Sequence, residues 1–389
     1  MKIAIFAGTL KQNQDGVTRV LFKQMEFFER MQVEFICVSP SFDEDSRCEK
    51  FVVPSIAFPL YPDYNLSLPL QKKILRRLKE YQPDVVYVNS PCTLGYMGIK
   101  ISKKLGIPVV ATYHTHFPTY LRYYKLNMFE GLVWKYIWHF YNQCDAVFVP
   151  SLSVVRNLQE KGINNCVFLS HGVDTNVFSP DKADKNWKRK LNLENKKVVL
   201  FVGRIVKEKN LDVLAEAIQI LNQKRDDFHL VVAGSGPYLE EYRARIKNST
   251  FLGHLYTEEL AVTYASSDIF VFPSVTETFG NVILEAMASG LPPVVAKSFG
   301  ASELINDFQN GLLAVENSAV SLAEKIEFLL DNDLFRRRLA ENAYSTGLEF
   351  SWNSILNKFN EKLFEIVEMR KSGKILTKEK EILALAENA

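Results

Sequence analysis

Two glutamates eight positions apart, Glu277 and Glu285, offer the clearest chemistry in this chain. Glu277 follows an apolar run, residues 268–273, that predicts a strand, and Glu285 lies about one turn inside the helix predicted next. Carboxylates accept hydrogen bonds from hydroxyl groups such as those of a sugar ring or a ribose. Between them, Gly280 and Asn281 place backbone N–H groups at the helix start, where a phosphate is favoured. The spacing therefore predicts a site for a ligand with hydroxyl groups at both ends and phosphate between them.

Two cations follow another predicted strand, residues 198–202. Arg204 comes directly after Gly203 at the carboxyl end of this strand, and Lys209 lies five residues later, near the start of a helix. A planar guanidinium and a compact ammonium suit two linked phosphates, and a departing diphosphate needs such charge stabilisation. The alternative for both cations, as for the two glutamates, is a solvated surface position.

Two histidines, His114 and His116, close the predicted strand of residues 109–112. A histidine at a strand end can hydrogen-bond a sugar hydroxyl or act as an acid or a base, although both also suit ordinary loop positions. Two histidines at this spacing lack a third ligand, so we expect no metal. Gly16 permits close approach of a ligand to the start of the helix predicted at residues 17–31, and a plain turn glycine is the alternative.

Short, nearly continuous apolar runs alternate with helix-length segments along the whole chain, which is typical of parallel sheets covered on both faces. The first series of predicted strands covers residues 3–6, 33–38, 85–88, 109–112 and 146–149. The second series covers residues 198–202, 230–233, 250–252, 269–272 and 293–296, with helices at 211–221 and 321–330 among those between them. Two such series predict an α/β protein with two doubly wound, Rossmann-like domains.

A length of 389 residues also favours two domains. The polar stretch at residues 179–184 interrupts the pattern and sets the expected boundary. We expect an N-terminal domain of residues 1–178, a C-terminal domain of residues 179–351, a helix at 352–370 and a helical tail of residues 371–389. Because ligands bind beyond the carboxyl ends of parallel strands, the expected site is a cleft in which the two domains face each other.

Composition narrows the classes of protein. Five cysteines with no CxxC pair argue against a disulfide framework and fit a reducing cytoplasm. No apolar run approaches the ~20 residues that span a bilayer, so we expect a soluble or peripheral protein. Residues 1–178 carry 20 Lys and Arg against 15 Asp and Glu, and the remainder carries 27 against 30. The basic first half suggests an anionic partner such as the inner face of the cell membrane, although ordinary variation also explains so small an excess.

The run from Phe272 to Ala296, which contains both glutamates, resembles the C-terminal signature of family 4 glycosyltransferases, whose hallmark is two Glu separated by seven residues. Further resemblances to this family lie at residues 170–174, 199–210, 231–237 and 251–253, and the resemblance as a whole runs from about Lys2 to about Phe364. The segment from His114 to Tyr120 resembles a narrower group that glycosylates membrane lipids, such as sulfoquinovosyl- and mannosyltransferases. The family's two-domain architecture is known as GT-B. It implies that the N-terminal domain binds the acceptor, that the C-terminal domain binds the nucleotide sugar, and that the helix at 352–370 returns to the N-terminal domain.

The resemblance implies a retaining hexosyltransferase with a front-face mechanism and no protein nucleophile. It implies that Glu277 and His114 contact the donor sugar, that Arg204 and Lys209 contact the pyrophosphate, and that Glu285 holds the ribose. Other donor-binding positions are expected at Gly16, Gly203, Gly234, Leu252, Gly253, Phe279, Gly280, Asn281 and Val282. Acceptor positions are expected at Asp15, Thr18, His116 and Tyr120. The nucleoside-diphosphate hexose, with UDP or GDP, is a substrate, and we expect no cofactor, no metal and no nucleic-acid partner.

Two stretches bear on the acceptor. Residues 70–79 predict a helix with one apolar side and five cations, which suits either a membrane surface or a helix packed on the sheet. Residues 120–141 carry nine aromatic residues among three cations, which suits a membrane interface or a core helix equally. We therefore expect a lipid acceptor, such as a glycerolipid or phospholipid, and an anionic membrane surface as partners.

Four other functions remain as alternatives. In the first, the enzyme is still a glycosyltransferase, but its acceptor is a soluble sugar or a polysaccharide. A sugar-nucleotide 2-epimerase can share the architecture, but the glutamate pair and the Gly-Arg…Lys motif favour a transferase. A nicotinamide dehydrogenase would need a Gly-x-Gly-x-x-Gly opening, which residues 6–11 lack. A sugar-binding module without catalysis would not need both cations together with both glutamates.

Overall fold

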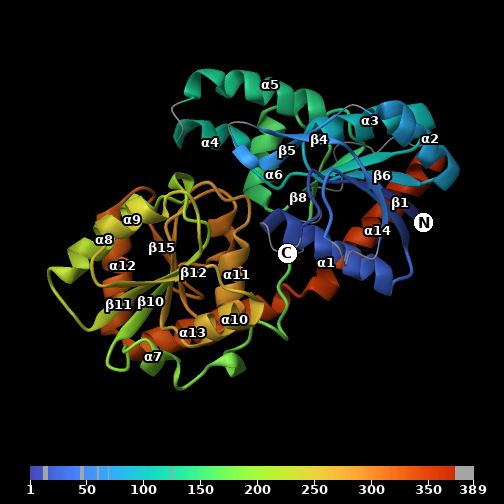
Figure 1. Cartoon of the computed structure of the whole chain (residues 1–389). Coiled ribbons are helices and arrows are strands. Elements are labelled where there is room, and N and C mark those ends of the chain that lie inside the picture. The colour runs from blue at the N-terminus through green and yellow to red at the C-terminus, as the bar shows by residue number, and fades with distance from the viewer. Residues whose placement is uncertain (12–15, 44–47, 59–60, 69, 124–125, 373–389) are drawn as a thin grey trace. The chain divides into compact units, whose positions relative to one another are not determined.

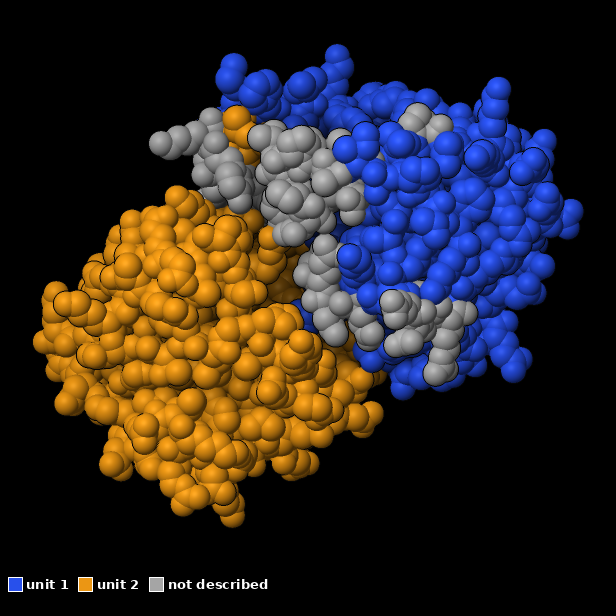
Figure 2. Space-filling view, in the orientation of Figure 1, with its two compact units in different colours: residues 1–118, 127–170, 353–389 blue, residues 119–126, 171–352 orange. Residues whose placement is uncertain are grey.

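The computed structural model describes residues 1–11, 16–43, 48–58, 61–68, 70–123 and 126–372 (Figure 1). Two compact units divide the chain: residues 1–118, 127–170 and 353–389 form the first, and residues 119–126 and 171–352 form the second (Figure 2). Each unit contains its own parallel sheet and its own hydrophobic core. This arrangement confirms the predicted fold class of two Rossmann-like domains.

The first sheet has seven described strands in the order β3-β2-β1-β6-β7-β8-β9, and all adjacent pairs are parallel. Their bounds are β1 Lys2–Phe6, β2 Glu34–Ser39, β3 Glu49–Val52, β6 Val85–Val88, β7 Val109–Thr112, β8 Ala146–Val149 and β9 Cys166–Phe168. The residues of β6, β7 and β8 are all buried, because helices cover both faces of the sheet. A separate antiparallel hairpin consists of β4 Ser55–Phe58 and β5 Tyr61–Ser67.

The helices of this part of the chain are α1 Gly16–Arg30, α2 Gln71–Tyr81, α3 Thr93–Leu105, α4 Phe117–Tyr123, η1 Asn127–Phe129, α5 Glu130–Tyr141 and α6 Leu152–Glu160. The last helix, α14 Trp352–Lys371, returns to the first sheet. Its Phe359 is fully buried and lies 5.6 Å from the ring of Tyr87 in β6 and 4.8 Å from the ring of Phe148 in β8. Residues 373–389, where a helical tail is predicted, lie outside the described residues.

The second sheet has six described strands in the order β12-β11-β10-β13-β14-β15, again with parallel pairs throughout. Their bounds are β10 Lys197–Val202, β11 Phe228–Ala233, β12 Ser249–Gly253, β13 Ile269–Phe272, β14 Pro293–Ala296 and β15 Leu312–Ala314. The helices are η2 Pro180–Lys182, α7 Trp187–Lys190, η3 Lys207–Lys209, α8 Leu211–Asn222, α9 Leu239–Arg245, α10 Thr257–Ala265, α11 Asn281–Ala288, η4 Ala301–Leu304, α12 Ala319–Asp331 and α13 Asp333–Glu349.

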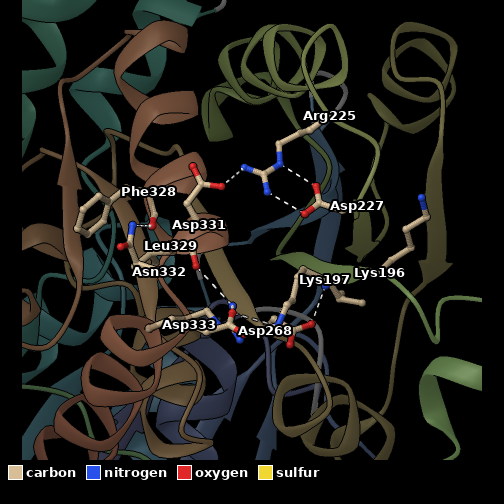
Figure 3. Close-up of polar contacts among 12 residues, drawn as sticks. Lys196, Lys197, Arg225, Asp227, Asp268, Phe328, Leu329, Asp331, Asn332 and Asp333 are labelled. Carbon is tan, nitrogen blue, oxygen red and sulfur yellow. Dashed lines mark hydrogen bonds and ion pairs between the residues drawn. The ribbon is translucent and has the colours of Figure 1, made fainter.

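Ion pairs fasten the amino-terminal edge of this second sheet (Figure 3). Arg225, which precedes β11, binds Asp227 through two parallel hydrogen bonds of 2.7 and 2.8 Å and also reaches Asp331 at the end of α12. Asp268, which precedes β13, accepts hydrogen bonds from the Val198 amide at 2.7 Å and from Lys188 Nζ at 2.5 Å. These contacts join the start of three neighbouring strands to the helices beside them.

Candidate active site

The strand order of the second sheet reverses between β10 and β13. The chain runs outward from β10 to β11 and β12, and then returns to place β13 on the other side of β10. Such a switch point is where ligands bind in open parallel sheets, beyond the carboxyl ends of the strands. Arg204 and Lys209 follow β10, and Glu277 follows β13, so the sheet brings the predicted cations and the first predicted glutamate to this one point.

Glu277 is held from two sides. Its Oε1 atom forms an ion pair with Lys209 and accepts a hydrogen bond of 3.0 Å from the hydroxyl of Ser274. The side chains of Lys209 and Glu277 are only 15% and 17% exposed. An ion pair screened from water in this way is less weakened by solvent than a surface pair. The carboxylate therefore has a defined orientation.

The loop that carries Glu277 is also fixed through its backbone. The hydroxyl of Thr276 donates to the carbonyl of Glu208 at 3.2 Å and thereby ties this loop to the segment that carries Lys209. Gly300 lies against the same loop with a positive φ of 64°, and a Cβ atom there would lie 2.2 Å from the carbonyl oxygen of Thr278. No other residue type fits at Gly300 without displacing this loop.

Glu285 lies within α11 and is buried, with 7% of its surface exposed. Its Oε2 atom accepts a hydrogen bond of 3.1 Å from the hydroxyl of Tyr264 in α10. Gly280 precedes α11 with a φ of 88°, a conformation that suits glycine. Asn281 and Val282 form the first turn of α11 and remain partly accessible. Glu285 is thus a buried, hydrogen-bonded carboxylate one turn after the start of α11.

His171 is packed against the same helix start. Its Nδ1 atom lies 2.8 Å from Oδ1 of Asn281, and its ring lies 5.1 Å from the buried ring of Phe279. Burial lowers the pKa of His171 to about 4, and the hydrogen bond to Asn281 only partly opposes this shift. The imidazole is therefore neutral at physiological pH and can donate a proton to the amide oxygen.

Three glycines allow the loops after β10, β11 and β12 to approach closely. A Cβ atom on Gly234 would lie 1.9 Å from the carbonyl oxygen of Gly203, and the amide of Gly234 donates to the carbonyl of Gly253 at 2.7 Å. Leu252, the neighbour of Gly253, is partly accessible at the end of β12. Three of the positions expected to bind the donor, Gly203, Gly234 and Gly253, therefore lie against one another at this edge of the sheet.

The first unit holds the two predicted histidines. His114 Nε2 lies 2.9 Å from Oδ1 of Asn89, a buried residue directly after β6. His116 diverges from His114, because its Nε2 atom lies 3.2 Å from Oδ1 of Asn157 in α6 and its ring packs edge-on against Trp134 at 5.4 Å. His114 is thus placed at the carboxyl edge of the first sheet, between the ends of β6 and β7.

Gly16 is the first residue of α1, and Thr18 is buried in the first turn of that helix. Asp15 lies outside the described residues. Tyr120 belongs to α4, but its side chain lies outside the description. Among the four predicted acceptor positions, the structure therefore describes the side-chain surroundings of Thr18 and His116.

Three residues that contact predicted site residues of the second unit were not predicted from the sequence. They are Ser274, Tyr264 and His171. His171 belongs to the segment 170–174, which carries part of the family resemblance, so that signal was present. Nothing in the sequence pairs Tyr264 with Glu285 or Ser274 with Glu277. Within the described ranges, no group of three His, Cys, Asp or Glu is arranged to hold a metal ion, and no helix is long and apolar enough to cross a membrane.

Comparison with known proteins places this geometry in a family. Residues 14–177 match the family described as Glycosyltransferase Family 4, and residues 183–346 match Glycosyl transferases group 1. A GDP-mannose-dependent alpha-mannosyltransferase of Mycobacterium tuberculosis is 31% identical over 80% of this chain and 83% of its own length. The alpha-monoglucosyldiacylglycerol synthase of Streptococcus pneumoniae is 28% identical over 90% of this chain and 83% of its own length.

Solved structures share the fold. The Anabaena protein HepE in complex with UDP and glucose has a TM-score of 0.76 and 21% identity, with 94% of this chain and 100% of that chain covered. The two family matches and the mycobacterial relative confirm the resemblance that includes Glu277 and Glu285. The two parallel sheets agree with it. The chain belongs to glycosyltransferase family 4 and is an enzyme that transfers sugars.

Proposed function

We propose that this enzyme moves a hexose, with retention of anomeric configuration, from a nucleoside-diphosphate sugar to a hydroxyl group of a membrane glycerolipid or phospholipid. The observation that carries the proposal is the pair of glutamates around the start of α11. Glu277 is fixed by Lys209 and Ser274, and Glu285 is fixed by Tyr264. Two oriented carboxylates and two nearby cations match a ligand with a hexose, a diphosphate and a ribose.

We propose that the donor lies along the carboxyl-terminal edge of the second sheet. Glu277 accepts hydrogen bonds from the hexose hydroxyls, and Glu285 accepts those of the ribose. The backbone amides at the start of α11 and the side chains of Arg204 and Lys209 contact the diphosphate. Lys209 then serves both groups, because it already binds Glu277 and its ammonium carries three donors. It therefore couples the position of the hexose to the position of the diphosphate.

The chemical step needs no protein nucleophile. The acceptor oxygen forms a bond with the anomeric carbon on the face from which the diphosphate leaves, and the bond between that carbon and the diphosphate oxygen breaks. The acceptor proton passes to a diphosphate oxygen. Arg204 and Lys209 stabilise the charge that develops on the leaving group, which is commonly the largest electrostatic contribution to such catalysis. His114, oriented by Asn89, contacts the hexose.

The lipid acceptor is supported by the names of related proteins. The Streptococcus pneumoniae relative is an alpha-monoglucosyldiacylglycerol synthase, and the sulfoquinovosyl transferase SQD2 of Arabidopsis thaliana is 31% identical over 78% of this chain and 61% of its own length. The same chemistry requires the enzyme to reach a bilayer surface, so we place it on the cytoplasmic face of the membrane as a peripheral protein.

The test offers UDP-glucose and GDP-mannose in parallel to the purified enzyme, with mixed micelles that contain diacylglycerol or a phospholipid. Labelled sugar should move into the organic phase with one of the two donors, and the product should be cleaved by an α-specific glycosidase. Label found only in water-soluble products would refute the lipid acceptor, and a β-linked product would refute retention. Thermal shifts with UDP and GDP identify the base, because a ligand at a hundredfold excess over its Kd stabilises the folded state by about 2.7 kcal/mol.

A further inference from the structure

Helix α5 and the turn η1 before it expose large apolar side chains to solvent. Met128 is 84% exposed, Leu132 is 66% exposed and Trp138 is 47% exposed. Phe129 and Tyr136 are also among the exposed residues of this segment. We call these five residues the α5 patch. Single exposed apolar residues are ordinary, but a group of this size on one helix marks an interaction surface.

The α5 patch is not the core-facing side of the helix. Ile137, Phe140 and Tyr141 fix α5 to the first unit, and each is at most 1% exposed. Leu132 lies nine residues before Tyr141, about half a turn around the helix axis from it, and its side chain is exposed. A helix that is apolar on both sides needs a second apolar environment besides the core. Residues of α5 such as Ile137 thus pack in the core, while others such as Leu132 are apolar and exposed.

Cations lie on both sides of α5. In α3, Lys100 Nζ lies 4.6 Å from the ring centre of Tyr96, and that ring lies 6.3 Å from the ring of His139 in α5. Lys103 donates to Gln143, just after α5, at 2.7 Å. On the other side, Lys161 Nζ lies 5.3 Å from the ring of Trp134. Ammonium groups therefore lie close to residues of α5 and to the elements packed beside it.

Helix α3 lies beside α5, and α2 lies beyond α3 (Figure 1). Helices α2, α3 and α5 together carry nine Lys and Arg against two Glu. The apolar side of α2 is not available for insertion, because Ile74 and Leu78 are fully packed inside. Its cations Lys72, Lys73 and Arg76 are exposed. Helix α2 thus supplies charge, and α5 supplies the exposed apolar surface.

We propose that the α5 patch inserts into the interface of an anionic bilayer while the cations of α2 and α3 contact the lipid headgroups. Aromatic residues next to Lys and Arg suit that interface, and each cation adds attraction to anionic lipid. A second copy of the chain fits less well, since a twofold interface would bring the same cations together. The inference rests on the proposed lipid acceptor, for which it identifies the surface that brings the enzyme to its substrate.

The main test is sedimentation with vesicles of phosphatidylcholine and phosphatidylglycerol. The double variant Met128→Ser with Leu132→Ser should bind these vesicles about tenfold or more weakly than the native enzyme, because two exposed apolar side chains no longer enter the interface. Its melting temperature should be unchanged, since both side chains already contact water. The matched control is Leu334→Ser with Val320→Ser, two residues of the second unit that are 84% and 58% exposed. The control should bind vesicles as the native enzyme does.

A second variant tests the charge. Lys72→Gln, Lys73→Gln and Arg76→Gln together should reduce binding at low salt by about tenfold or more, and the difference should shrink as salt is raised. The Met128 and Leu132 variant should instead remain weak at high salt.

The proposal would be overturned if the Met128 and Leu132 variant bound vesicles as tightly as the native enzyme. It would also be overturned if the control variant lost as much vesicle binding as the Met128 and Leu132 variant. An oligomer in solution that dissociates only in the Met128 and Leu132 variant while vesicle binding persists would overturn it as well. If the lipid acceptor is wrong but this surface is right, the native enzyme will bind vesicles and glycosylate only soluble acceptors. Loss of vesicle binding in the double variant, with donor affinity unchanged, supports the docking surface alone.

Discussion

The second sheet carries an ion pair of similar burial at each of its two edges. At the amino-terminal edge, Lys188 pairs with Asp268, and these side chains are 27% and 17% exposed. At the carboxyl-terminal edge, Lys209 pairs with Glu277, and these side chains are 15% and 17% exposed. The two pairs share charge type and burial, so any difference in their roles comes from what surrounds them.

The surroundings differ in one respect. Asp268 also accepts the Val198 amide, so it closes a strand start and belongs to the network of ion pairs in Figure 3. Glu277 lies at the switch point of the sheet beside the start of α11, and its neighbours are hydroxyl-bearing loops rather than strand starts. The Lys188–Asp268 pair therefore lies at the starts of strands within the sheet, and the Lys209–Glu277 pair lies beyond the carboxyl ends of the strands. We therefore infer a structural role for Asp268 and a functional role for Glu277.

Removing Glu277 should have the largest effect. Glu277→Ala should lower the rate of sugar transfer by a factor on the order of a hundred or more, because the donor hexose loses an oriented acceptor at the reacting end. The melting temperature should fall less than in Asp268→Asn, because that substitution also weakens the acceptor of the Val198 amide at a strand start. Initial rates and thermal melts of both proteins measure the two effects. A variant with native activity would refute the assignment of Glu277.

His171 links the carboxyl-terminal edge to pH. Its pKa is about 4 in the folded state and about 6.5 in an unfolded chain, so the unfolded chain takes up the proton first as pH falls. Its contribution to stability is complete above pH 6.5 and is lost between about 6.5 and 4. One pKa unit is worth about 1.4 kcal/mol, so the full loss is on the order of 3 kcal/mol.

The variant His171→Gln isolates this contribution, because the amide can still bond to Asn281 but does not titrate. Urea unfolding at several pH values should give a flatter dependence for the variant between pH 6.5 and 4. All other carboxylates and histidines titrate equally in both proteins. Parallel curves for the two proteins would show that His171 is protonated in the folded state at an ordinary pH.

Asp268→Asn reverses the pattern expected of Glu277→Ala. The variant should lose on the order of 1–3 kcal/mol of unfolding free energy, because Lys188 loses its charged partner and the Val198 amide loses part of its acceptor strength. Transfer rates at a temperature well below the melting point should stay within about twofold of native. Chemical denaturation and initial rates decide the matter. If activity falls as far as in Glu277→Ala, the contrast between the two edges is wrong.

The sequence predicted the central strands well but only one of the four edge strands, β12. β1, β6, β7 and β8 were located within one residue, because buried central strands are short, continuous runs of β-branched residues. The edge strands β3, β9 and β15 were missed, since Glu49–Val52 is mixed in polarity and the other two have three residues each. Edge strands pair on one side only, so a weak pattern suffices for them.

The residues of the candidate site were predicted from local pattern, but the contacts between them were not. Each of Glu277, Glu285 and Lys209 was proposed from its position at a strand end or helix start, which local pattern reveals. The ion pair between Lys209 and Glu277 joins residues 68 apart, and the contact between His171 and Asn281 joins residues 110 apart. Such contacts depend on strand order, and one sequence alone does not determine the order.

Arg204 should show a smaller effect than Glu277. Arg204→Ala should weaken binding of the nucleoside diphosphate by about tenfold and leave binding of the free nucleoside nearly unchanged, because a charge-assisted contact to phosphate is lost. Lys209→Ala should do the same, but it also removes the partner of Glu277 and should therefore reduce the transfer rate in addition. Calorimetry with both ligands separates the contributions, and equal losses for the two ligands would contradict a pyrophosphate contact.

Chelation should have the smallest effect of all. The charge on the departing diphosphate is neutralised in our proposal by Arg204 and Lys209, where a metal-dependent transferase would place carboxylates around a divalent ion. Transfer rates should therefore be unchanged after EDTA treatment, within the error of the assay. Because the Lys209 ammonium is already shared with Glu277, a metal ion at the same place would compete with it for that carboxylate. Loss of activity that Mg²⁺ or Mn²⁺ restores would show that the carboxyl-terminal edge works through a bound ion, and Glu277 would then be the first candidate ligand to test.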